Sequence, residues 1–329
     1  MSSEAQRELT KALRRAAVRA TRAPSVHNTQ PWQFVLNADT LEIFADTSRQ
    51  LRVLDPHGRQ LLLSCGCALF NARVSLAAMG YAAHVERFPD PSRIDLVARI
   101  SAGPLGDSPD AGLAQLDPVI DERRTNRRQF IDEHVPPEIV AMLIDAAGRE
   151  GAEVFAIERP EDRLTVARLS QQADDLENSD PAYRAELRAW TSDDPRREDG
   201  VNAFAAPHVD GDAQDDQPIR DFDSRGTGWL PMQAHSGLNQ CLLLLGARDD
   251  SRMAWLRAGE ALERVLLEIA RRGFAASPLS QAVEVPTTNA LLRQELELTM
   301  HPHVLLRVGR APIVSPTRRR RLVDMLIEV

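Results

Sequence analysis

A short segment near the start of the chain carries polar groups at a spacing that suits ligand binding. Residues 23–34 read Ala-Pro-Ser-Val-His-Asn-Thr-Gln-Pro-Trp-Gln-Phe. Pro24 and Pro31 restrict the backbone near the two ends, and the hydroxyl, amide and imidazole groups between them donate and accept hydrogen bonds without carrying charge. Such a loop suits a ligand with many neutral polar edges. The same residues are also typical of a capped turn before a strand, and the loop alone leaves both interpretations open.

A second group of residues suits the binding of an anion. Arg123, Arg124 and Arg127 surround Thr125, and a further basic run occupies residues 318–321. A guanidinium group binds a phosphate through two parallel hydrogen bonds. Only one of the 40 lysine and arginine residues is a lysine, so arginine must hold any bound phosphate and a lysine Schiff base is nearly excluded. Basic runs are otherwise typical of solvated faces, so these arginines indicate little by themselves.

Several other kinds of site find no support in the sequence. It contains no Walker A motif, no Gly-x-Gly-x-x-Gly after a strand, no His-Glu-x-x-His and no Gly-x-Ser-x-Gly. Cys65 and Cys67 are separated by one residue where zinc sites use two to four, and small thiols of this kind usually pack in a core. Proline separates His301 from His303 and breaks helical spacing. We therefore predict no metal ligand.

The composition is that of a globular protein that avoids anionic surfaces. Of the 329 residues, 43% are hydrophobic and 27% are charged, and the formal net charge is −8. A negative molecule repels nucleic acid and anionic membranes, so we expect neither as a partner. The longest apolar stretches, around residues 61–63 and 242–245, are far shorter than the roughly 20 residues that span a bilayer. The polar start MSSEAQRELT is unlike a signal peptide, and we expect a cytoplasmic protein.

Hydrophobic periodicity and turn residues predict the elements that position these groups. Residues 3–20 form an amphipathic helix that opens with a capping box of Ser3 and Gln6. Asp55 and Pro56 supply the cap and the first-turn proline of a long helix. The expected strands of this region cover residues 33–36 and 41–45, joined as a hairpin, and residues 84–88 and 94–100, while the long helix stops at Gly80.

The rest of the chain continues in the same mixed manner. Residues 103–111 are rich in Gly, Pro, Ser and Asp and are typical of a linker. Residues 191–227 are dense in Asp, Gly, Arg and Pro, and long irregular segments of this kind are usually lids, binding loops or disordered inserts. The remaining expected helices cover residues 136–148, 162–176, 181–190 and 252–272, and the remaining expected strands cover residues 153–157, 242–245 and 303–308.

The order of these elements repeats. A helix leads through a connection into a strand at residues 13–34 and again at 143–155, and a long helix of small residues ends in glycine at both Gly80 and Gly273. A chain of this length suits two packed units. We therefore expect an α+β fold of two fused halves. The first half covers residues 1–110, and the second covers residues 111–329 and contains the insert at 191–227.

The motifs together resemble those of the nitroreductase family, whose members use FMN. Ala-Pro-Ser-x-x-Asn-x-Gln-Pro-Trp-x-Phe at residues 23–34 is similar to the family's flavin-contacting loop. Residues 123–127 are similar to an Arg-x-Ser-x-Arg or Lys element, with threonine in place of serine. Residues 273–281 resemble the turn that lays backbone amides against the reactive flavin edge, and Arg319 with Arg320 resembles a basic pair that closes on the phosphate. Within the family, nearly the whole chain resembles the double-length, single-chain Acg-like nitroreductases of actinobacteria.

The resemblance implies a nitroreductase-like pseudo-dimer in one chain, with one flavin site and a monomeric state. The first half supplies the Ala-Pro-Ser loop and the second supplies the arginines, while residues 146–151 stand where the second half would carry an equivalent loop. The residues that the resemblance implies as FMN ligands are Pro24, Ser25, Asn28, Gln30, Arg123, Arg124, Thr125, Arg127, Pro278, Leu279, Ser280, Gln281, Arg319 and Arg320.

The activity that the resemblance implies is a two-step exchange. NADH or NADPH reduces the flavin, and a nitroaromatic or quinone-like acceptor takes the electrons. The flavin N5 carries the chemistry, Arg127 would stabilise the anionic reduced flavin, and the backbone near Ser280 and Gln281 would face N5. The insert at 191–227 departs from the family pattern and would act as a lid over the flavin. The alternative is a protein that stores, sequesters or senses FMN with little turnover.

Overall fold

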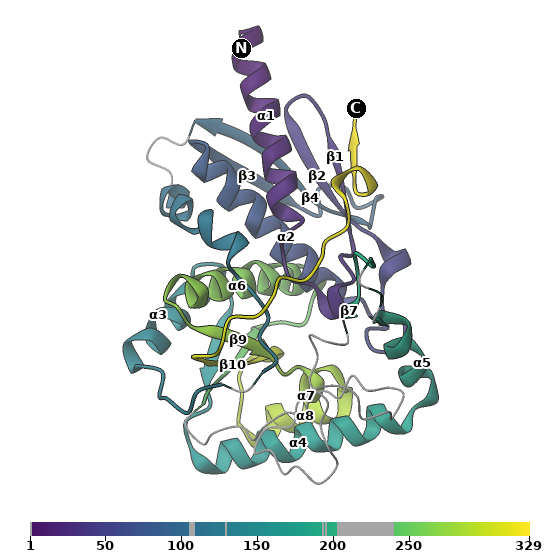
Figure 1. The fold of residues 1–329 in the computed structure, drawn as a ribbon, viewed down its shortest axis with the longest axis vertical. Helices are drawn as coiled ribbons and strands as arrows, with labels where there is room; N and C mark the ends of the chain where they lie inside the picture. Colours follow the sequence, from purple (N-terminus) through teal and green to yellow (C-terminus); the bar gives the residue numbers. More distant parts are fainter. Residues whose placement is uncertain (1, 105–108, 129, 193, 195, 203–239) are drawn as a thin grey trace.

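The computed structural model describes residues 2–104, 109–128, 130–192, 194, 196–202 and 240–329. Residues 105–108 of the expected linker and residues 203–227 of the expected lid lie outside the described residues. Figure 1 shows two α+β regions, one above the other, with long helices between them. The predicted mixed α+β class is confirmed.

The first region consists of two long helices and one sheet with four antiparallel strands from this part of the chain. Its helices are α1 (Ser3–Ala20) and α2 (Arg59–Ala78), and its strands are β1 (Trp32–Leu36), β2 (Thr40–Ala45), β3 (Tyr81–Arg87) and β4 (Leu96–Pro104). The hairpin of β1 and β2 is confirmed as an antiparallel pair. All four strands and both helices were expected, with boundaries that differ by a few residues.

Two predicted helix starts need correction. Helix α1 is capped by Ser2 and not by Ser3, because the Ser2 hydroxyl accepts a hydrogen bond from Ala5 N at 3.1 Å. Helix α2 begins after Gly58, whose φ of 76° is left-handed, so the proline at position 56 lies outside the helix. Asp55 still acts at this end, since its carboxylate accepts a hydrogen bond from Leu61 N at 2.9 Å.

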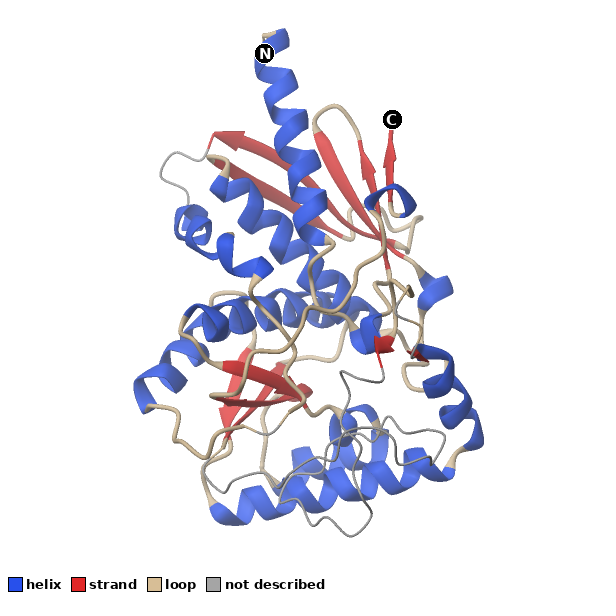
Figure 2. Cartoon of the chain, viewed as in Figure 1, coloured by secondary structure: helices blue, strands red, loops and turns tan. Residues whose placement is uncertain are grey.

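The second region repeats this arrangement and adds a helical layer. Its main helices and strands are α3 (Pro137–Gly148), β5 (Glu153–Ala156), β8 (Cys241–Ala247), α6 (Arg252–Arg271), β9 (Ala275–Pro278) and β10 (His301–Gly309). The added layer consists of α4 (Pro160–Ser179), α5 (Pro181–Trp190), α7 (Gln281–Glu284) and α8 (Pro286–Glu295), and two short strands, β6 (Thr191–Ser192) and β7 (Val201–Asn202), pair beside it. Figure 2 shows α4, α7 and α8 below the second sheet and α5 to its right. Two 3-10 segments, η3 (Pro109–Leu116) and η4 (Pro118–Asp121), connect the regions.

The two main sheets have the same strand order. The first runs β11-β1-β2-β4-β3 and the second runs β5-β8-β10-β9. If β11 is set aside, each sheet places its strands in the chain order first, second, fourth, third, and every neighbouring pair is antiparallel. The helix before the first strand and the helix between the second and third strands also correspond, α1 with α3 and α2 with α6.

The end of the chain returns to the first sheet. Strand β11 (Leu326–Glu328) pairs in parallel with β1, with Phe34 opposite Leu326. Residues 310–321 run from the second region to the first to reach this position, as the yellow segment in Figure 1 shows. This pairing was not predicted from the sequence. It places residues numbered within the second half in the sheet of the first half.

Helices α2 and α6 cross in close contact at two glycines. A Cβ atom on Gly66 would lie 2.1 Å from the carbonyl oxygen of Leu256, and one on Gly259 would lie 2.1 Å from the carbonyl oxygen of Leu63. Gly66 therefore packs against the residue three positions before Gly259, and Gly259 packs against the residue three positions before Gly66. Since no side chain fits there, the crossing depends on glycine in both helices and holds the two regions together.

Helix α2 forms part of the central core. It is long and apolar enough to pass a test for a membrane-spanning helix, the only one among the described residues, and 94% of the relevant window is buried inside the protein. Its side chains pack against α1, α6 and the first sheet. These properties are those of a core helix.

Candidate functional site

The Ala-Pro-Ser loop has an unusual backbone. His27, Asn28 and Gln30 have φ values of 45°, 54° and 50°, a left-handed region that non-glycine residues rarely adopt. The Ser25 hydroxyl accepts a hydrogen bond from Gln30 N at 2.9 Å, which closes the loop on itself. Strained residues of this kind concentrate at ligand-binding sites. Three within four positions mark this loop as a candidate site independently of its motif.

Contacts from the distant parts of the chain hold the loop in this conformation. The Gln30 side chain donates to Glu198 O at 2.9 Å and accepts from Arg320 N at 2.8 Å. Asn28 Nδ2 donates to Gly200 O at 3.0 Å, and Gly200 N donates to Asn28 O at 3.2 Å. The described part of the insert and the C-terminal tail therefore both pack on the loop.

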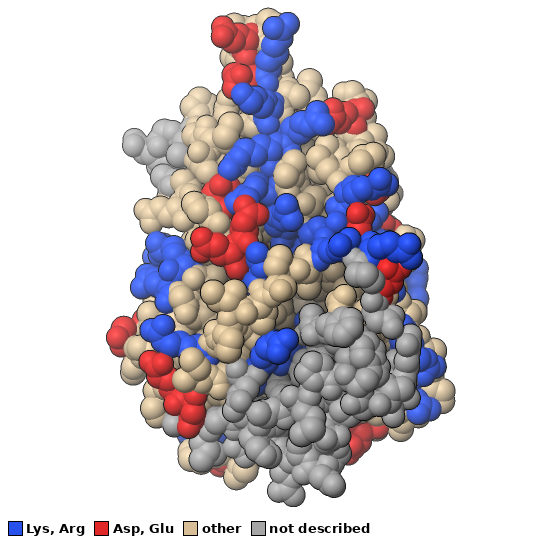
Figure 3. Space-filling view, in the orientation of Figure 1, with Lys and Arg blue, Asp and Glu red and all other residues tan. Residues whose placement is uncertain are grey.

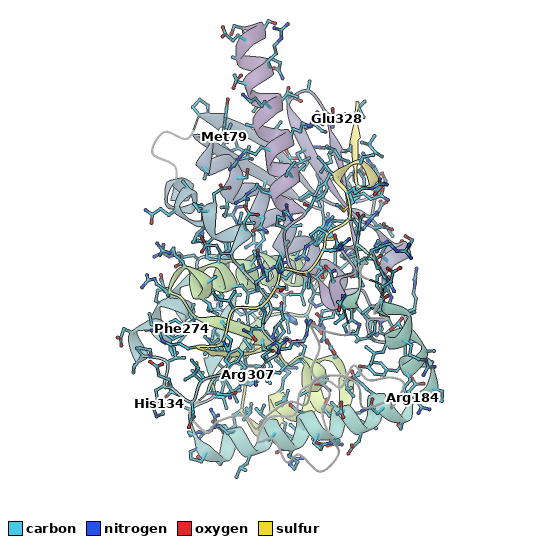
Figure 4. All side chains as sticks on the ribbon, viewed as in Figure 1. Met79, His134, Arg184, Phe274, Arg307 and Glu328 are labelled. Atoms are coloured by element: carbon cyan, nitrogen blue, oxygen red, sulfur yellow. The ribbon has the colours of Figure 1, made fainter. Side chains whose placement is uncertain are left out.

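The arginine segment is fastened to the second sheet. Thr125 forms a parallel bridge with Ala276 of β9, and Asn126 N donates to Ala276 O at 2.9 Å. Further along, the Arg307 guanidinium of β10 lies 4.2 Å from the ring centre of Phe130. Figure 4 labels Arg307 on this sheet. These contacts explain how a loop without regular structure holds its arginines in place.

The loop and the arginine segment together enclose a cavity that we call the polar chamber. Its volume is about 280 Å³. Figure 3 shows Lys and Arg side chains gathered across the middle of the molecule and along α1. Five arginines line the polar chamber against a single carboxylate, Asp121. The lining residues are Arg22, Pro24, Ser25, Asn28, Ile120, Asp121, Arg123, Arg124, Thr125, Arg127, Gly200, Val201, Ser315, Pro316, Thr317 and Arg319.

The positive charge of the polar chamber is only partly balanced by protein. Arg123 Nε lies 3.6 Å from Oε1 of Glu263, a fully buried residue of α6. Burial raises the pKa of Glu263 to about 7, although Arg123 acts in the opposite direction. Burial, followed by the charge of Arg123, lowers the pKa of Arg319 to about 9 and shifts that of Arg124 downward. Lowered arginine pKa values mean that the chamber holds more positive charge than its surroundings stabilise.

Two of these arginines have buried donors that no described residue satisfies. The Nε atoms of Arg123 and Arg319 are shielded from solvent and have no hydrogen-bond partner among the described residues. Arg319 otherwise donates to Asn28 Oδ1 at 3.1 Å and to Thr317 Oγ1 at 2.6 Å. A buried charged donor without an acceptor is costly. An anion in the polar chamber would supply the missing acceptors.

A second cavity, which we call the apolar chamber, adjoins the first. Both are lined by Pro24, Ser25, Thr125 and Arg127. Helices α2 and α6 provide its walls, and Gln60 contributes a buried Nε2 with no hydrogen-bond partner among the described residues. The residues that line only this chamber are Val26, His27, Gln60, Leu63, Ser64, Cys67, Leu262, Leu266, Pro278, Ser280, Gln281, Glu284 and Val304.

The structure brings 11 of the 14 expected ligands to the two chambers. Gln30, Leu279 and Arg320 line neither chamber. The Gln30 side chain spends its hydrogen bonds on Glu198 and Arg320, Leu279 is buried in a core cluster of the second region, and Arg320 donates to Gln30 O at 3.2 Å. None of these three residues lines either chamber, so their contacts are with other parts of the protein.

Several residues at the site carried no signal in the sequence. Glu263 lies in the middle of a helix whose pattern reads as an ordinary core helix, and Arg22 precedes the loop motif by one residue. Gln60, Ser64 and Cys67 recur every three or four residues along α2, which indicates one helix face. That spacing was detectable, but only the tertiary structure shows that the face meets the Ala-Pro-Ser loop.

The geometry defines a class of ligand. A basic, partly buried pocket holds an anionic group, and the neighbouring slot offers apolar walls with a few amide and hydroxyl groups at its edge. A flat aromatic ring system that carries a phosphate matches both parts. Among the described residues, no group of His, Cys, Asp and Glu could hold a metal ion.

Comparison with known proteins identifies the family. The chain is 36% identical over 315 residues to a protein of Mycobacterium tuberculosis named putative NAD(P)H nitroreductase, with 93% of this chain and 88% of the relative covered. It is 30% identical over 329 residues to the putative NAD(P)H nitroreductase Acg of the same organism, with 97% and 96% covered. The chain belongs to the nitroreductase family. No protein-family model matches it.

Solved structures give more distant similarities. A putative nitroreductase from Anabaena variabilis aligns at 11% identity with a TM-score of 0.48, covering 83% of this chain and 69% of that one. A nitroreductase with bound FMN from Desulfitobacterium hafniense aligns at 12% identity with a TM-score of 0.40, covering 65% and 98%.

Proposed function

We propose that this protein binds FMN and acts as an NAD(P)H-dependent oxidoreductase of the nitroreductase type. The observation that carries the proposal is the pair of adjoining chambers, one with unsatisfied buried arginine donors and one with apolar walls. FMN carries one terminal phosphate on a short chain attached to its ring system, which matches an anion pocket that adjoins an apolar chamber. The names of the two mycobacterial relatives support the reaction class and the dinucleotide donor.

The residues of the polar chamber suit the phosphate of FMN. Arg123, Arg124 and Arg319 line this chamber. A phosphate bound there would accept hydrogen bonds from Arg123 Nε and Arg319 Nε, which have no hydrogen-bond partner among the described residues. Arg127 lines both chambers and would hold negative charge at the pyrimidine edge of the ring. Ser280 and Gln281, at the start of α7, would lie at the reactive edge. The proposal assigns no adenine site, so FMN is favoured over FAD.

The bound flavin would supply the redox chemistry by accepting hydride from NADPH or NADH and reducing a nitroaromatic or quinone-like acceptor. The protein's own residues bind and orient the ring, hold charge near it and limit the access of water. No nucleophilic side chain is required. Cys67 lines the apolar chamber, but burial keeps the pKa of its thiol well above the ordinary value, so it is not a thiolate.

We also propose that the two halves are a fused pseudo-dimer with one flavin site and that the chain is a monomer. The matching strand orders and the reciprocal glycine crossing support the pseudo-dimer. Four residues after Gly259 stands Glu263, which pairs with Arg123 of the polar chamber, whereas four residues after Gly66 stands Phe70. The guanidinium groups of Arg73 and Arg264 lie 5.4 and 5.1 Å from the Phe70 ring centre.

Ion pairs fill the region around Phe70. Arg73 contacts Glu150 at 2.5 Å and Glu260 at 2.7 Å, Arg87 contacts Glu260 at 2.6 Å, and Arg264 contacts Glu150 at 2.7 Å. Glu150 lies in the short connection that stands where the second half would carry its own Ala-Pro-Ser loop. The arginines there are paired by carboxylates of the protein, which supports a single anion site in the chain.

Cofactor analysis tests this proposal directly. We expect the purified protein, after reconstitution if necessary, to contain about one FMN per chain and to sediment as a monomer. Anaerobic NADPH should bleach the flavin absorbance, and a nitroaromatic or quinone should restore it. Heat release followed by mass measurement identifies the cofactor. Recovery of FAD, or of no flavin after reconstitution, would contradict the proposal, and two flavins per chain would contradict the single site.

A second candidate function is FMN storage without turnover. One observation favours it: Gly200 and Val201 of the described part of the insert wall the polar chamber, and Gly200 is bonded to Asn28 in both directions. The expectation that the insert forms a lid rests largely on residues outside the described ones and stays a prediction. The anaerobic experiment separates the functions, since a storage protein would hold FMN that NADPH does not reduce.

Glu263 makes FMN binding depend on pH. Ionised Glu263 neutralises Arg123, whereas the protonated form leaves the full positive charge to the phosphate. Since burial raises the pKa of Glu263 to about 7, phosphate binding should favour proton uptake, and affinity should increase as the pH falls from 8 toward 6.5. The increase is limited to about tenfold per pH unit, because one proton is involved. Fluorescence titration of the flavin-free protein measures it.

Two controls isolate the effect of Glu263. Glu263→Gln should bind FMN tightly at both pH values and lose the pH dependence. Riboflavin, which lacks the phosphate, should bind the parent protein with little change over this range. A pH dependence that survives in Glu263→Gln would assign the titration to another group.

A further inference from the structure

Glu284 lies at the boundary between the apolar chamber and a second cavity. It is the last residue of α7, it is buried, and it lines both the apolar chamber and an outer cavity of about 650 Å³. The outer cavity is not used by the function proposed above. Among the residues that line the apolar chamber, Glu284 is the only carboxylic acid.

Asp55 lines the outer cavity close to Glu284. Its side chain is buried, and its carboxylate accepts a hydrogen bond from Leu61 N at 2.9 Å. Burial raises the pKa of Asp55 to about 6. Hydrogen bonds from the backbone of Leu61 and Gln60 and the charge of Arg59 lower this pKa, and the charge of Glu284 raises it. Asp55 therefore exchanges its proton near neutral pH and is electrostatically coupled to Glu284.

The other charged groups of the outer cavity come from every element around it. Carboxylates outnumber guanidinium groups, so the cavity is electronegative and favours protons over anions. The groups are His57 and Arg59 before and in α2, Glu177 of α4, Asp180 at the cap of α5, Asp250 before α6, Arg293 of α8 and His301 of β10.

We propose that Glu284 donates a proton to an electron acceptor bound against the flavin ring at the Glu284 side of the apolar chamber, and that Asp55 and the outer cavity return the proton to Glu284. The proposal rests on the oxidoreductase function proposed above. Two-electron reduction of a quinone carbonyl or a nitro group develops negative charge on oxygen. A new O–H bond then forms as the O–H bond of Glu284 breaks, and the electron pair remains on its carboxylate. The two electrons would come from the reduced flavin as a hydride, whose hydrogen is the second of the two that a hydroquinone or a reduced nitro group needs.

Two other groups in the apolar chamber, Cys67 and Ser64, are less suited to this step. Burial holds the pKa of Cys67 well above the ordinary value, and the Cys67 thiol donates to Gly259 O at 3.2 Å. The Ser64 hydroxyl donates to Gln60 O at 2.7 Å within its own helix. Glu284 has a carboxyl group that can carry a proton, and it faces the outer cavity as well as the apolar chamber, so the proton can return by a path that avoids the acceptor.

Infrared titration tests the coupling without any turnover. The carbonyl bands of protonated carboxyls should grow as the pH of the purified, flavin-loaded protein falls from 8 to 5. The Asp55 band is the component that titrates near pH 6 and is missing in Asp55→Asn, whereas Glu263→Gln removes the component that titrates near pH 7. In Glu284→Gln the Asp55 band should titrate at lower pH, because the charge that raises the pKa of Asp55 is gone. An unshifted Asp55 titration in Glu284→Gln would overturn the relay.

Reoxidation of the loaded protein tests the donation step. The flavin is reduced with dithionite in the absence of oxygen, and a water-soluble quinone is added while flavin absorbance is followed at several pH values. We expect Glu284→Gln to slow reoxidation about 100-fold, the lower end of the range for general acids, and to lose both the pH dependence and the solvent isotope effect. Glu138→Gln, which changes an exposed carboxyl of α3 that lines neither the apolar chamber nor the outer cavity, should behave like the parent.

The outcomes separate this proposal from the function on which it rests. A parent protein that is reoxidised by quinone, with Glu284→Gln equally fast and equally pH-dependent, would overturn the donor role alone. A parent that binds FMN but is not reoxidised by quinone or nitroaromatic compounds would overturn the oxidoreductase function together with it. Unchanged FMN affinity in Glu284→Gln shows that any slow reoxidation is not caused by a damaged cofactor site.

Discussion

Arg319→Ala is expected to weaken FMN binding by about 1.5 to 3 kcal/mol, which is roughly 10- to 150-fold in Kd. Arg319 lines the polar chamber, and its buried Nε has no hydrogen-bond partner among the described residues. A charge-assisted hydrogen bond to a phosphate would satisfy that donor, and alanine removes the bond while leaving the phosphate in a site built for its charge. Fluorescence titration of the flavin-free protein measures the change.

The same side chain also supports the Ala-Pro-Ser loop, so the experiment needs two controls. Riboflavin lacks the phosphate, and its affinity should be nearly unchanged if Arg319 acts on the phosphate; an equal loss for riboflavin would show that the arginine acts through Asn28 and the loop. Arg321→Ala serves as the matched variant in the same tail, because Arg321 is exposed, lies outside both chambers and pairs with Asp324 at 3.0 Å. Its FMN affinity should equal that of the parent.

Gly66→Ala is expected to lower the free energy of unfolding by about 3 kcal/mol or more, at or beyond the upper end of ordinary overpacking costs. The added Cβ would meet the carbonyl oxygen of Leu256 at 2.1 Å. A flexible side chain cannot move aside here, because the obstacle is the backbone of α6, so the two central helices must separate. Thermal or denaturant unfolding measures the loss, and impaired FMN binding should accompany it because both helices wall the apolar chamber.

The reciprocal geometry of the crossing provides strong controls for this prediction. Gly259→Ala should cost a similar amount, since its Cβ would meet the carbonyl oxygen of Leu63 at 2.1 Å. Gly148→Ala makes the same substitution in α3, where no atom lies within 4 Å, and should stabilise the protein by up to about 1 kcal/mol through helix propensity. Equal effects of all three substitutions would mean that the close crossing does not carry the cost.

Much of the secondary structure was predictable because its signals are local. The periodicity of residues 3–20 and 252–271 identifies two helices, and a run of apolar and small residues identifies a third at 59–78. Gly80 and Gly273 mark two of their ends with φ values of 81° and 74°. The cap at Ser2 was missed because Ser2 and Ser3 are equivalent in sequence, and only the backbone conformation decides which side chain accepts the bond.

Strand β11 could not be predicted from the sequence. Three residues are too short for a periodic pattern, and the strand forms only because residues 310–321 carry the chain back to β1. Pairing across such a separation depends on the whole fold. The equal strand order of the two sheets has the same character. The sequence predicts every strand of these sheets except β9 and β11, but it does not predict which strands are neighbours.

The candidate site divides in the same way. The sequence by itself determined which residues are chemically able to bind a phosphate and a polar ring, because proline, hydroxyl, amide and arginine side chains carry those properties in any fold. Tertiary structure alone decided which of them meet. In the folded protein, Gln30 and Arg320 hydrogen-bond to each other and line neither chamber. Glu263 is buried next to Arg123, and Glu284 lines both the apolar chamber and the outer cavity. Burial, pairing and pKa depend on neighbours far away in the chain, and those neighbours exist only in the folded protein.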